Sequence, residues 1–200
     1  MPHAKKVAVV GHSFVKKLKV FVDKDEGTDL NLQLTGAVVD YMGFSGLKLN
    51  GLEHRVKEKL ERFKPDTVCL IIGENDIKSS LQAESLVVNI IEKAEDIQMW
   101  SGGAVTIVCQ LMPRYWAPSY PYFILGYNEI AEAANRILSS KLSGRSDIVF
   151  WPHAFICKKT NIDFRDAEKY FAADGVHLAN NGQFCLYKSL QKAVRFHNKE

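Results

Sequence analysis

The sequence lacks the features that mark metal, redox and membrane proteins. None of its four cysteines stands in a Cys-x-x-Cys pair, and its six histidines show neither His-x-His nor His-Glu-x-x-His spacing. This argues against a zinc or redox motif, and we expect neither a metal nor an organic cofactor. No apolar run is long enough to span a bilayer, and no apolar signal segment precedes the first predicted strand. The simplest interpretation is an intracellular, reduced protein of the cytoplasm.

Charge of either sign is not in large excess. Lys and Arg number 26 and Asp and Glu 23, a net charge of +3, so there is no direct nucleic-acid signal. At 200 residues and 46% hydrophobic composition the chain can bury one sizeable core. Because the sequence shows no repeat, linker or low-complexity segment, we expect residues 1–200 to form a single domain.

Short apolar runs alternate with longer amphipathic stretches. The runs are continuous rather than alternating, as is typical of parallel strands covered on both faces. They predict strands at 7–10, 37–39, 67–72, 104–109 and 147–151. Helical spacing predicts helices near 14–22, 52–63, 81–99, 123–142 and 183–196, the last with Phe184, Tyr187, Leu190 and Val194 on its inner face. This alternation predicts an α/β fold, a three-layer α/β/α sandwich around a five-stranded parallel sheet.

An acid and an imidazole stand three residues apart in Asp174-Gly175-Val176-His177. Such a carboxylate can hold the imidazole in one tautomer and stabilise its positive charge, as in Ser-His-Asp catalysis. Ser13 follows the first predicted strand and is the candidate nucleophile, with His177 as general base. The alternatives are ordinary ones: Ser13 as a helix N-cap, and Asp174-Gly175 as a plain turn.

Three groups could donate hydrogen bonds to an oxyanion. They are the side-chain amide of Asn75, in Gly73-Glu74-Asn75-Asp76, and the backbone N–H groups of Gly46 and Ser13. Each motif also has an ordinary structural interpretation: Gly46 as a loop glycine, and Asn75-Asp76 as a cap at the start of a helix. Because strand ends collect at one edge of a parallel sheet, all of these residues can meet there.

These motifs resemble, in order, the four blocks of the SGNH (GDSL-type) hydrolase superfamily. The blocks are Gly11-His12-Ser13, Gly46, Gly73-Glu74-Asn75-Asp76 and Asp174-Gly175-Val176-His177. The resemblance spans about residues 7–196 and implies a flavodoxin-like sandwich and a Ser-His-Asp esterase. It implies Ser13 as nucleophile, Gly46 and Asn75 as oxyanion donors, and Asp174 and His177 as the other triad members.

One position departs from the family pattern. The family usually has Asp before the nucleophilic serine, where this chain has His12. The triad survives this change, but the hydrogen bonds by which that Asp braces the loop are in doubt. Gly11-His12-Ser13-Phe14-Val15 also resembles esterase-like domains carried by some animal retrotransposons. That resemblance implies a domain of a larger polyprotein, with an indirect link to nucleic acid or membranes.

An aromatic and proline-rich segment, residues 113–122, is the predicted substrate rim, with Arg114, Tyr115, Trp116 and Tyr120 as its main members. A stiff apolar wall with one cation suits a small-molecule or lipid ester; the alternative is a packed surface loop. The sequence therefore predicts a serine esterase acting on small or lipid-like acyl esters. Two alternatives stay open. One is a non-catalytic binding or assembly module, which the departure from the family pattern at His12 favours. The other is an acyltransferase that uses the same residues.

Overall fold

Five parallel strands form one sheet in the computed structural model, which describes residues 4–78, 82–115, 121–157 and 169–197. The strands are β1 (Lys5–Gly11), β2 (Ala37–Gly43), β3 (Thr67–Ile71), β4 (Val105–Cys109) and β5 (Ile148–Trp151). Their order is β2-β1-β3-β4-β5, and every pair is parallel. The predicted parallel sheet and the flavodoxin-like fold are thus confirmed.

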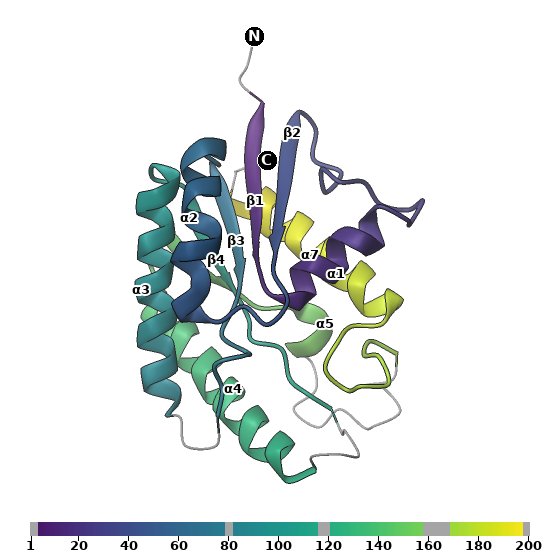
Figure 1. Cartoon of the computed structure of the whole chain (residues 1–200), viewed down its shortest axis with the longest axis vertical. Helices are drawn as coiled ribbons and strands as arrows, with labels where there is room; N and C mark the ends of the chain where they lie inside the picture. Colours follow the sequence, from purple (N-terminus) through teal and green to yellow (C-terminus); the bar gives the residue numbers. More distant parts are fainter. Residues whose placement is uncertain (1–3, 79–81, 116–120, 158–168, 198–200) are drawn as a thin grey trace.

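Helices cover both faces of the sheet, which gives the predicted three layers (Figure 1). One core cluster joins α2 (Leu52–Phe63), α3 (Ala83–Ser101) and α4 (Pro121–Lys141) to one face. The other joins α1 (Ser13–Val22) and α7 (Asn180–His197) to the opposite face. Two short elements, η1 (Leu49–Gly51) and α5 (Ala154–Cys157), lie in loops and were not predicted. Within the described ranges, no helix combines the length and apolarity needed to cross a membrane.

The continuous apolar strands are explained by this double cover. Along β1, Ala8 and Val10 belong to the first core cluster, whereas Val7 and Val9 belong to the second. Successive side chains of a strand point to opposite faces, so both sets must be apolar when both faces are covered. All four side chains are fully buried.

Two glycines let the site-bearing end of β1 pack closely. A Cβ on Gly11 would lie 2.1 Å from the carbonyl oxygen of Ile71, at the end of the neighbouring β3. A Cβ on Gly43 would lie 2.3 Å from the backbone nitrogen of Lys16, in the first turn of α1. The closeness of these backbones excludes any side chain at either position.

The prediction that Phe184 lies on the inner face of the last helix was wrong. Phe184 is 36% exposed, whereas Tyr187, Leu190 and Val194 are buried as predicted. The buried stripe of α7 includes Gly182 and Gln183 instead, which leaves Phe184 at its margin. The ammonium of Lys188 lies 5.6 Å from the centroid of the Phe184 ring.

A buried histidine follows β5. The Nδ1 atom of His153 lies 2.8 Å from Ser189 Oγ, and its backbone N–H donates to Gln110 Oε1. Its Nε2 atom is buried with no hydrogen-bond partner among the described residues. Burial lowers the pKa of this side chain to about 4, because an imidazolium cannot be hydrated there.

We therefore expect His153 to make the fold acid-sensitive. The pKa of this histidine is about 6.5 in the unfolded chain. As the pH falls below that value, His153 becomes protonated in the unfolded state but stays neutral in the folded state. Stability present above pH ~6.5 should be lost as the pH falls toward 4, by roughly 3 kcal/mol in total. Denaturant unfolding of wild type and His153→Gln between pH 7.5 and 4 should show a flatter profile for the variant. Parallel profiles would contradict the assignment.

Candidate active site

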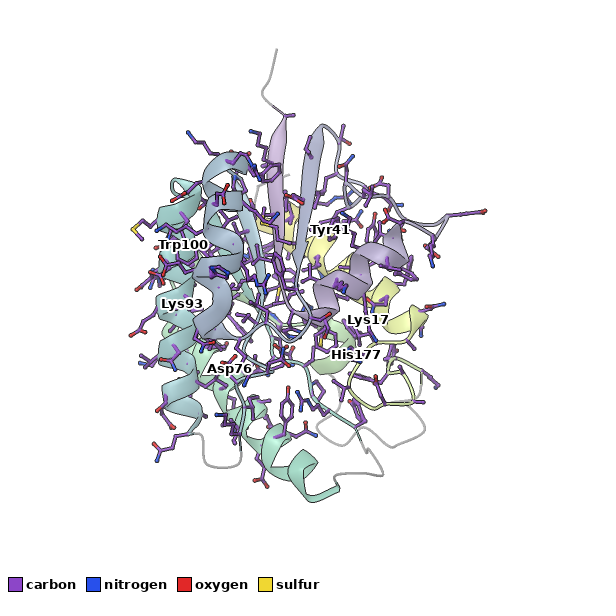
Figure 2. The ribbon with its side chains drawn as sticks, in the orientation of Figure 1. Lys17, Tyr41, Asp76, Lys93, Trp100 and His177 are labelled. Carbon is purple, nitrogen blue, oxygen red and sulfur yellow. The ribbon has the colours of Figure 1, made fainter. Side chains whose placement is uncertain are left out.

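The carboxyl ends of the strands bring together residues far apart in the sequence. Figure 2 shows Asp76, after β3, and His177, before α7, at the same end of the molecule, while Tyr41 and Trp100 lie away from that end. Open parallel sheets bind ligands at this edge.

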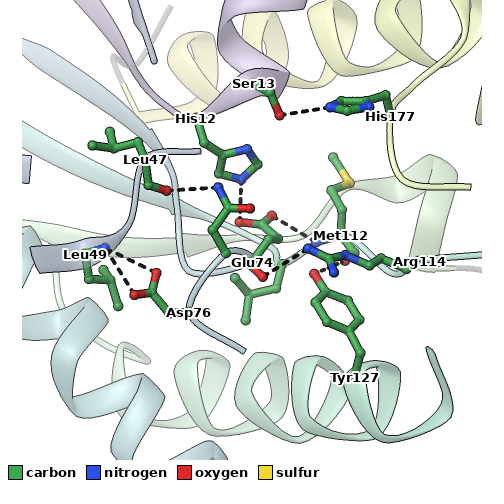
Figure 3. A network of polar contacts seen from close by, with 12 residues as sticks. His12, Ser13, Leu47, Leu49, Glu74, Asp76, Met112, Arg114, Tyr127 and His177 are labelled. Atoms are coloured by element: carbon green, nitrogen blue, oxygen red, sulfur yellow. Dashed lines mark hydrogen bonds and ion pairs between the residues drawn. The ribbon is translucent and has the colours of Figure 1, made fainter. Parts of the chain in front are cut away.

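Ser13 is the first residue of α1 and follows β1 after one intervening residue. The N-cap of α1 is His12, and no side chain caps the helix. The alternative reading of Ser13 as a helix N-cap is therefore not what the structure shows. Its hydroxyl is directed toward the loop before α7 instead (Figure 3).

Three side chains form a continuous chain of hydrogen bonds. Ser13 Oγ lies 3.1 Å from His177 Nε2, and His177 Nδ1 lies 2.6 Å from Asp174 Oδ2. With the ring proton on Nδ1, the imidazole donates to the carboxylate and accepts the serine O–H at Nε2. This arrangement can take a proton from the hydroxyl while the carboxylate stabilises the resulting imidazolium.

Asp174 also shapes the loop that carries His177. Its Oδ1 atom accepts the backbone N–H groups of Val176 and His177, at 2.9 and 2.8 Å. Partial burial raises the Asp174 pKa, but the hydrogen bonds from the His177 ring and from the two backbone N–H groups outweigh it and lower the pKa to about 2. The predicted Asp-Gly turn exists, with Gly175 at φ +67°, and its acid orients the imidazole as well.

Backbone contacts hold this loop against the segment that follows β4. Ala172 N–H donates to His177 O, which closes the loop on itself, and Tyr115 N–H donates to Gly175 O, both at 2.7 Å. The position of the imidazole therefore depends on the segment after β4 as well as on its own loop.

Asn75 and Asp76 tie the loop after β3 to the loop after β2. The Asn75 amide donates to Leu47 O at 3.0 Å, and Asp76 accepts the Leu49 N–H. Burial raises the pKa of Asp76 more than this bond lowers it. Asn75 lines the pocket beside Ser13, whereas Gly46 does not line it and stands next to Leu47 with φ +71°. One amide N–H of Asn75 is thus anchored, and the other can serve a ligand.

A small, partly open pocket lies beside Ser13. Its lining combines polar residues with a small apolar wall: His12, Ser13, Phe14, Glu74, Asn75, Met112, Pro113, Arg114, Tyr127 and Val176. Of the predicted rim segment, Pro113 and Arg114 line this pocket, and the Arg114 guanidinium lies 4.2 Å from the centroid of the Tyr127 ring.

Tyr115, another predicted rim residue, is not part of the described pocket lining. The Tyr115 ring packs on Phe171, at 4.4 Å between centroids, and burial raises its pKa to about 12. Trp116 and Tyr120 lie outside the described residues.

Sequence reasoning missed several residues that hold the site. Glu74 pairs with His12 in the pocket lining. Asn128 and Asn135 of α4 each donate to and accept from the backbone of one residue after β4, Arg114 and Leu111 respectively. Their spacing of seven puts them on one helix face, a signal that could have been noticed. The spacing of His12 and Glu74 in the sequence does not predict their contact.

Known structures share this architecture. No protein-family model matches the sequence, and no curated protein matches it. A GDSL-like lipase from Bacteroides thetaiotaomicron has a TM-score of 0.72 at 17% identity, over 98% of this chain and 90% of its own. A carbohydrate esterase of family 3 from Talaromyces cellulolyticus gives 0.65 at 14%, over 98% and 99%. A proposed SGNH hydrolase from Slackia heliotrinireducens gives 0.67 at 15%, over 96% and 99%. The chain has the fold of these hydrolases.

Proposed function

We propose that the chain is a serine esterase that hydrolyses small or lipid-like acyl esters. The observation that carries this proposal is the hydrogen-bonded series Asp174–His177–Ser13, whose serine lines a pocket. A surface serine, histidine and aspartate rarely need such an arrangement for stability alone, since exposed pairs contribute little. The fold shared with lipases and esterases agrees with it.

The reaction proceeds through an acyl-enzyme. His177 Nε2 takes the Ser13 proton as the oxygen attacks the ester carbonyl, and a tetrahedral oxyanion forms. The carbon–oxygen bond to the alcohol then breaks, and His177 returns the proton to the leaving alkoxide. Water, activated by the same imidazole, attacks the acyl-serine and releases the acid. Asp174 stays ionised throughout, in keeping with its lowered pKa of about 2.

Oxyanion donors come from two loops and a helix start. The Asn75 amide is fixed by Leu47 O, so its second N–H needs no reorganisation to meet the developing charge. The backbone N–H of Ser13 stands at the N-terminus of α1, where the helix dipole favours an anion. Gly46, next to Leu47, is the third proposed donor.

The resemblance of residues 11–15 to esterase-like domains carried by some retrotransposons stays a prediction from those residues.

Labelling with a fluorophosphonate tests the proposal directly. A serine activated by His177 should be phosphonylated at Ser13 with release of fluoride, and peptide mapping should find the adduct there. Pretreated protein should no longer hydrolyse p-nitrophenyl acetate. A wild-type protein that is folded yet neither labelled nor active would instead be a binding module. Offering an alcohol beside water as acyl acceptor separates hydrolase from acyltransferase.

Asn75→Ala should lower kcat by on the order of 10²- to 10³-fold, because an oxyanion donor acts mainly in the transition state. KM should change much less. Since this variant also frees Leu47 O, Asp76→Asn serves as the matched control: it weakens the neighbouring tie to Leu49 without removing a donor to the pocket. Equal losses of kcat in both variants would mean that Asn75 only holds the loop in place and is not an oxyanion donor.

A further inference from the structure

A buried, hydrogen-bonded pair of side chains, His12 and Glu74, lies between the candidate nucleophile and the candidate oxyanion donor. His12 Nε2 lies 2.8 Å from Glu74 Oε2, and the two side chains are only 3% and 4% exposed. His12 directly precedes Ser13, and Glu74 directly precedes Asn75. Removing two polar groups from water is costly, and an apolar pair of the same volume is often at least as stable. Stability alone therefore does not explain the pair.

Glu74 connects three strand ends (Figure 3). Its Oε2 atom meets His12 after β1, and its Oε1 atom accepts the Met112 N–H after β4, at 3.2 Å. Its backbone carbonyl accepts from Arg114 Nη2 at 3.4 Å. Burial raises the Glu74 pKa, but the charge and hydrogen bond of His12, with backbone N–H groups, outweigh it and keep the pKa below its ordinary value.

We propose that His12 and Glu74 are positioning residues that set the spacing between the Ser13 hydroxyl and the Asn75 amide. The inference rests on the proposed esterase function. A hydrogen bond between the two preceding residues fixes the nucleophile loop against the oxyanion loop, and Glu74 anchors both to the segment after β4. Displacements of about 1 Å between reacting groups can cost on the order of 10² in rate.

The pair also explains the departure from the family pattern at residue 12. An Asp at this position would put a second carboxylate into the buried surroundings of Glu74, where like charges repel strongly. With Glu74 in place, residue 12 must be a hydrogen-bond donor long enough to reach Oε2, and His12 meets both conditions. The histidine thus takes over the bracing role and does not signal a loss of catalysis.

Variants at residue 12 separate positioning from folding. His12→Gln keeps an N–H donor at similar reach, whereas His12→Leu removes it. The fluorophosphonate counts the competent Ser13 sites, and kcat is expressed per labelled site. We expect His12→Leu to lower kcat per site by on the order of 10²-fold, with little change in KM, and His12→Gln to stay within a few-fold of wild type.

Gln191→Leu is the matched control for lost buried polarity. Its side-chain amide donates to Leu32 O at 2.7 Å, eleven residues, or about 16 Å, along α7 from the helix start. This variant should lose stability with kcat per site unchanged. If His12→Leu behaves the same way, or if His12→Gln is as slow as His12→Leu, the positioning role is overturned.

Variants at Glu74 provide a second test should His12→Leu fail to fold. Glu74→Gln keeps the length of the side chain and can still bond His12, whereas Glu74→Asp keeps the charge but is shorter by one methylene. A spacing role predicts near-normal kcat per site for Glu74→Gln and a loss on the order of 10²-fold for Glu74→Asp. The reverse order overturns it. An inactive, unlabelled wild type would instead refute the esterase proposal itself.

Discussion

Replacement of Ser13 by alanine should lower kcat for p-nitrophenyl acetate by on the order of 10⁴- to 10⁶-fold. The proposed mechanism uses Ser13 as its nucleophile, and the Ser13 Oγ atom lies 3.1 Å from His177 Nε2, the proposed base. The structure makes this a clean substitution. Ser13 does not cap α1, so alanine, the best helix former, should leave the thermal midpoint unchanged or slightly raised.

Ser101→Ala is the matched control for loss of a serine hydroxyl. Its Oγ atom donates to Gln98 O at the end of α3, just before β4 begins. Ser101 therefore lies at the amino-terminal ends of the strands, opposite the candidate site at their carboxyl ends. This variant should keep full activity. Retention of more than about a tenth of wild-type kcat by Ser13→Ala would remove the serine mechanism.

The double variant Ser13→Ala/His177→Ala tests whether the two residues act as one unit. Groups that share a single proton transfer lose their contributions together, so the double variant should be no slower than the slower single variant. Multiplied losses would mean that His177 acts on something other than the Ser13 hydroxyl.

The layers of the fold could be predicted because burial on both faces leaves a strong mark in the sequence. Runs such as residues 7–10 contain no polar side chain, and their fully buried positions show why. The strand order could not be derived from the runs themselves, since nothing in a single strand specifies its neighbour. It was implied only by the family resemblance.

The site was predictable in proportion to how local its contacts are. Asp174 and His177 are three residues apart, so their pairing could be inferred from spacing. His12 and Glu74 are 62 residues apart, and their pairing exists only because β1 and β3 are neighbours in the sheet. A departure from the family pattern at His12 was visible in the sequence, but its partner was not.

Phe184 shows the same limit within one helix. Helical spacing predicts a stripe to within one residue on either side, and the margin of that stripe is decided by what packs against it. Here Gln183 is buried and Phe184 is left partly exposed. The prediction of the helix was right, and the prediction of its edge was wrong.

Asp174→Asn should lower kcat by on the order of 10⁴-fold while leaving the fold nearly intact. The asparagine oxygen can replace Oδ1 and accept the N–H groups of Val176 and His177. Its NH₂ group then faces His177 Nδ1, where the carboxylate stood. Two donors cannot share that contact, so Nδ1 becomes the acceptor and the ring proton moves to Nε2. An imidazole with its proton on Nε2 cannot accept the Ser13 proton.

Thermal unfolding distinguishes this loss from damage to the loop. Asp174→Asn should keep a midpoint close to wild type because both backbone N–H groups keep an acceptor, whereas Asp174→Ala should lose activity and loop stability together. Asp66→Asn is the matched control, since Asp66 accepts the Lys6 N–H at 2.7 Å near the start of β3, away from the site. Near-normal turnover by Asp174→Asn would show that the carboxylate does not set the tautomer of His177. In that case Asp174 would serve the turn alone, and another group would have to orient the imidazole.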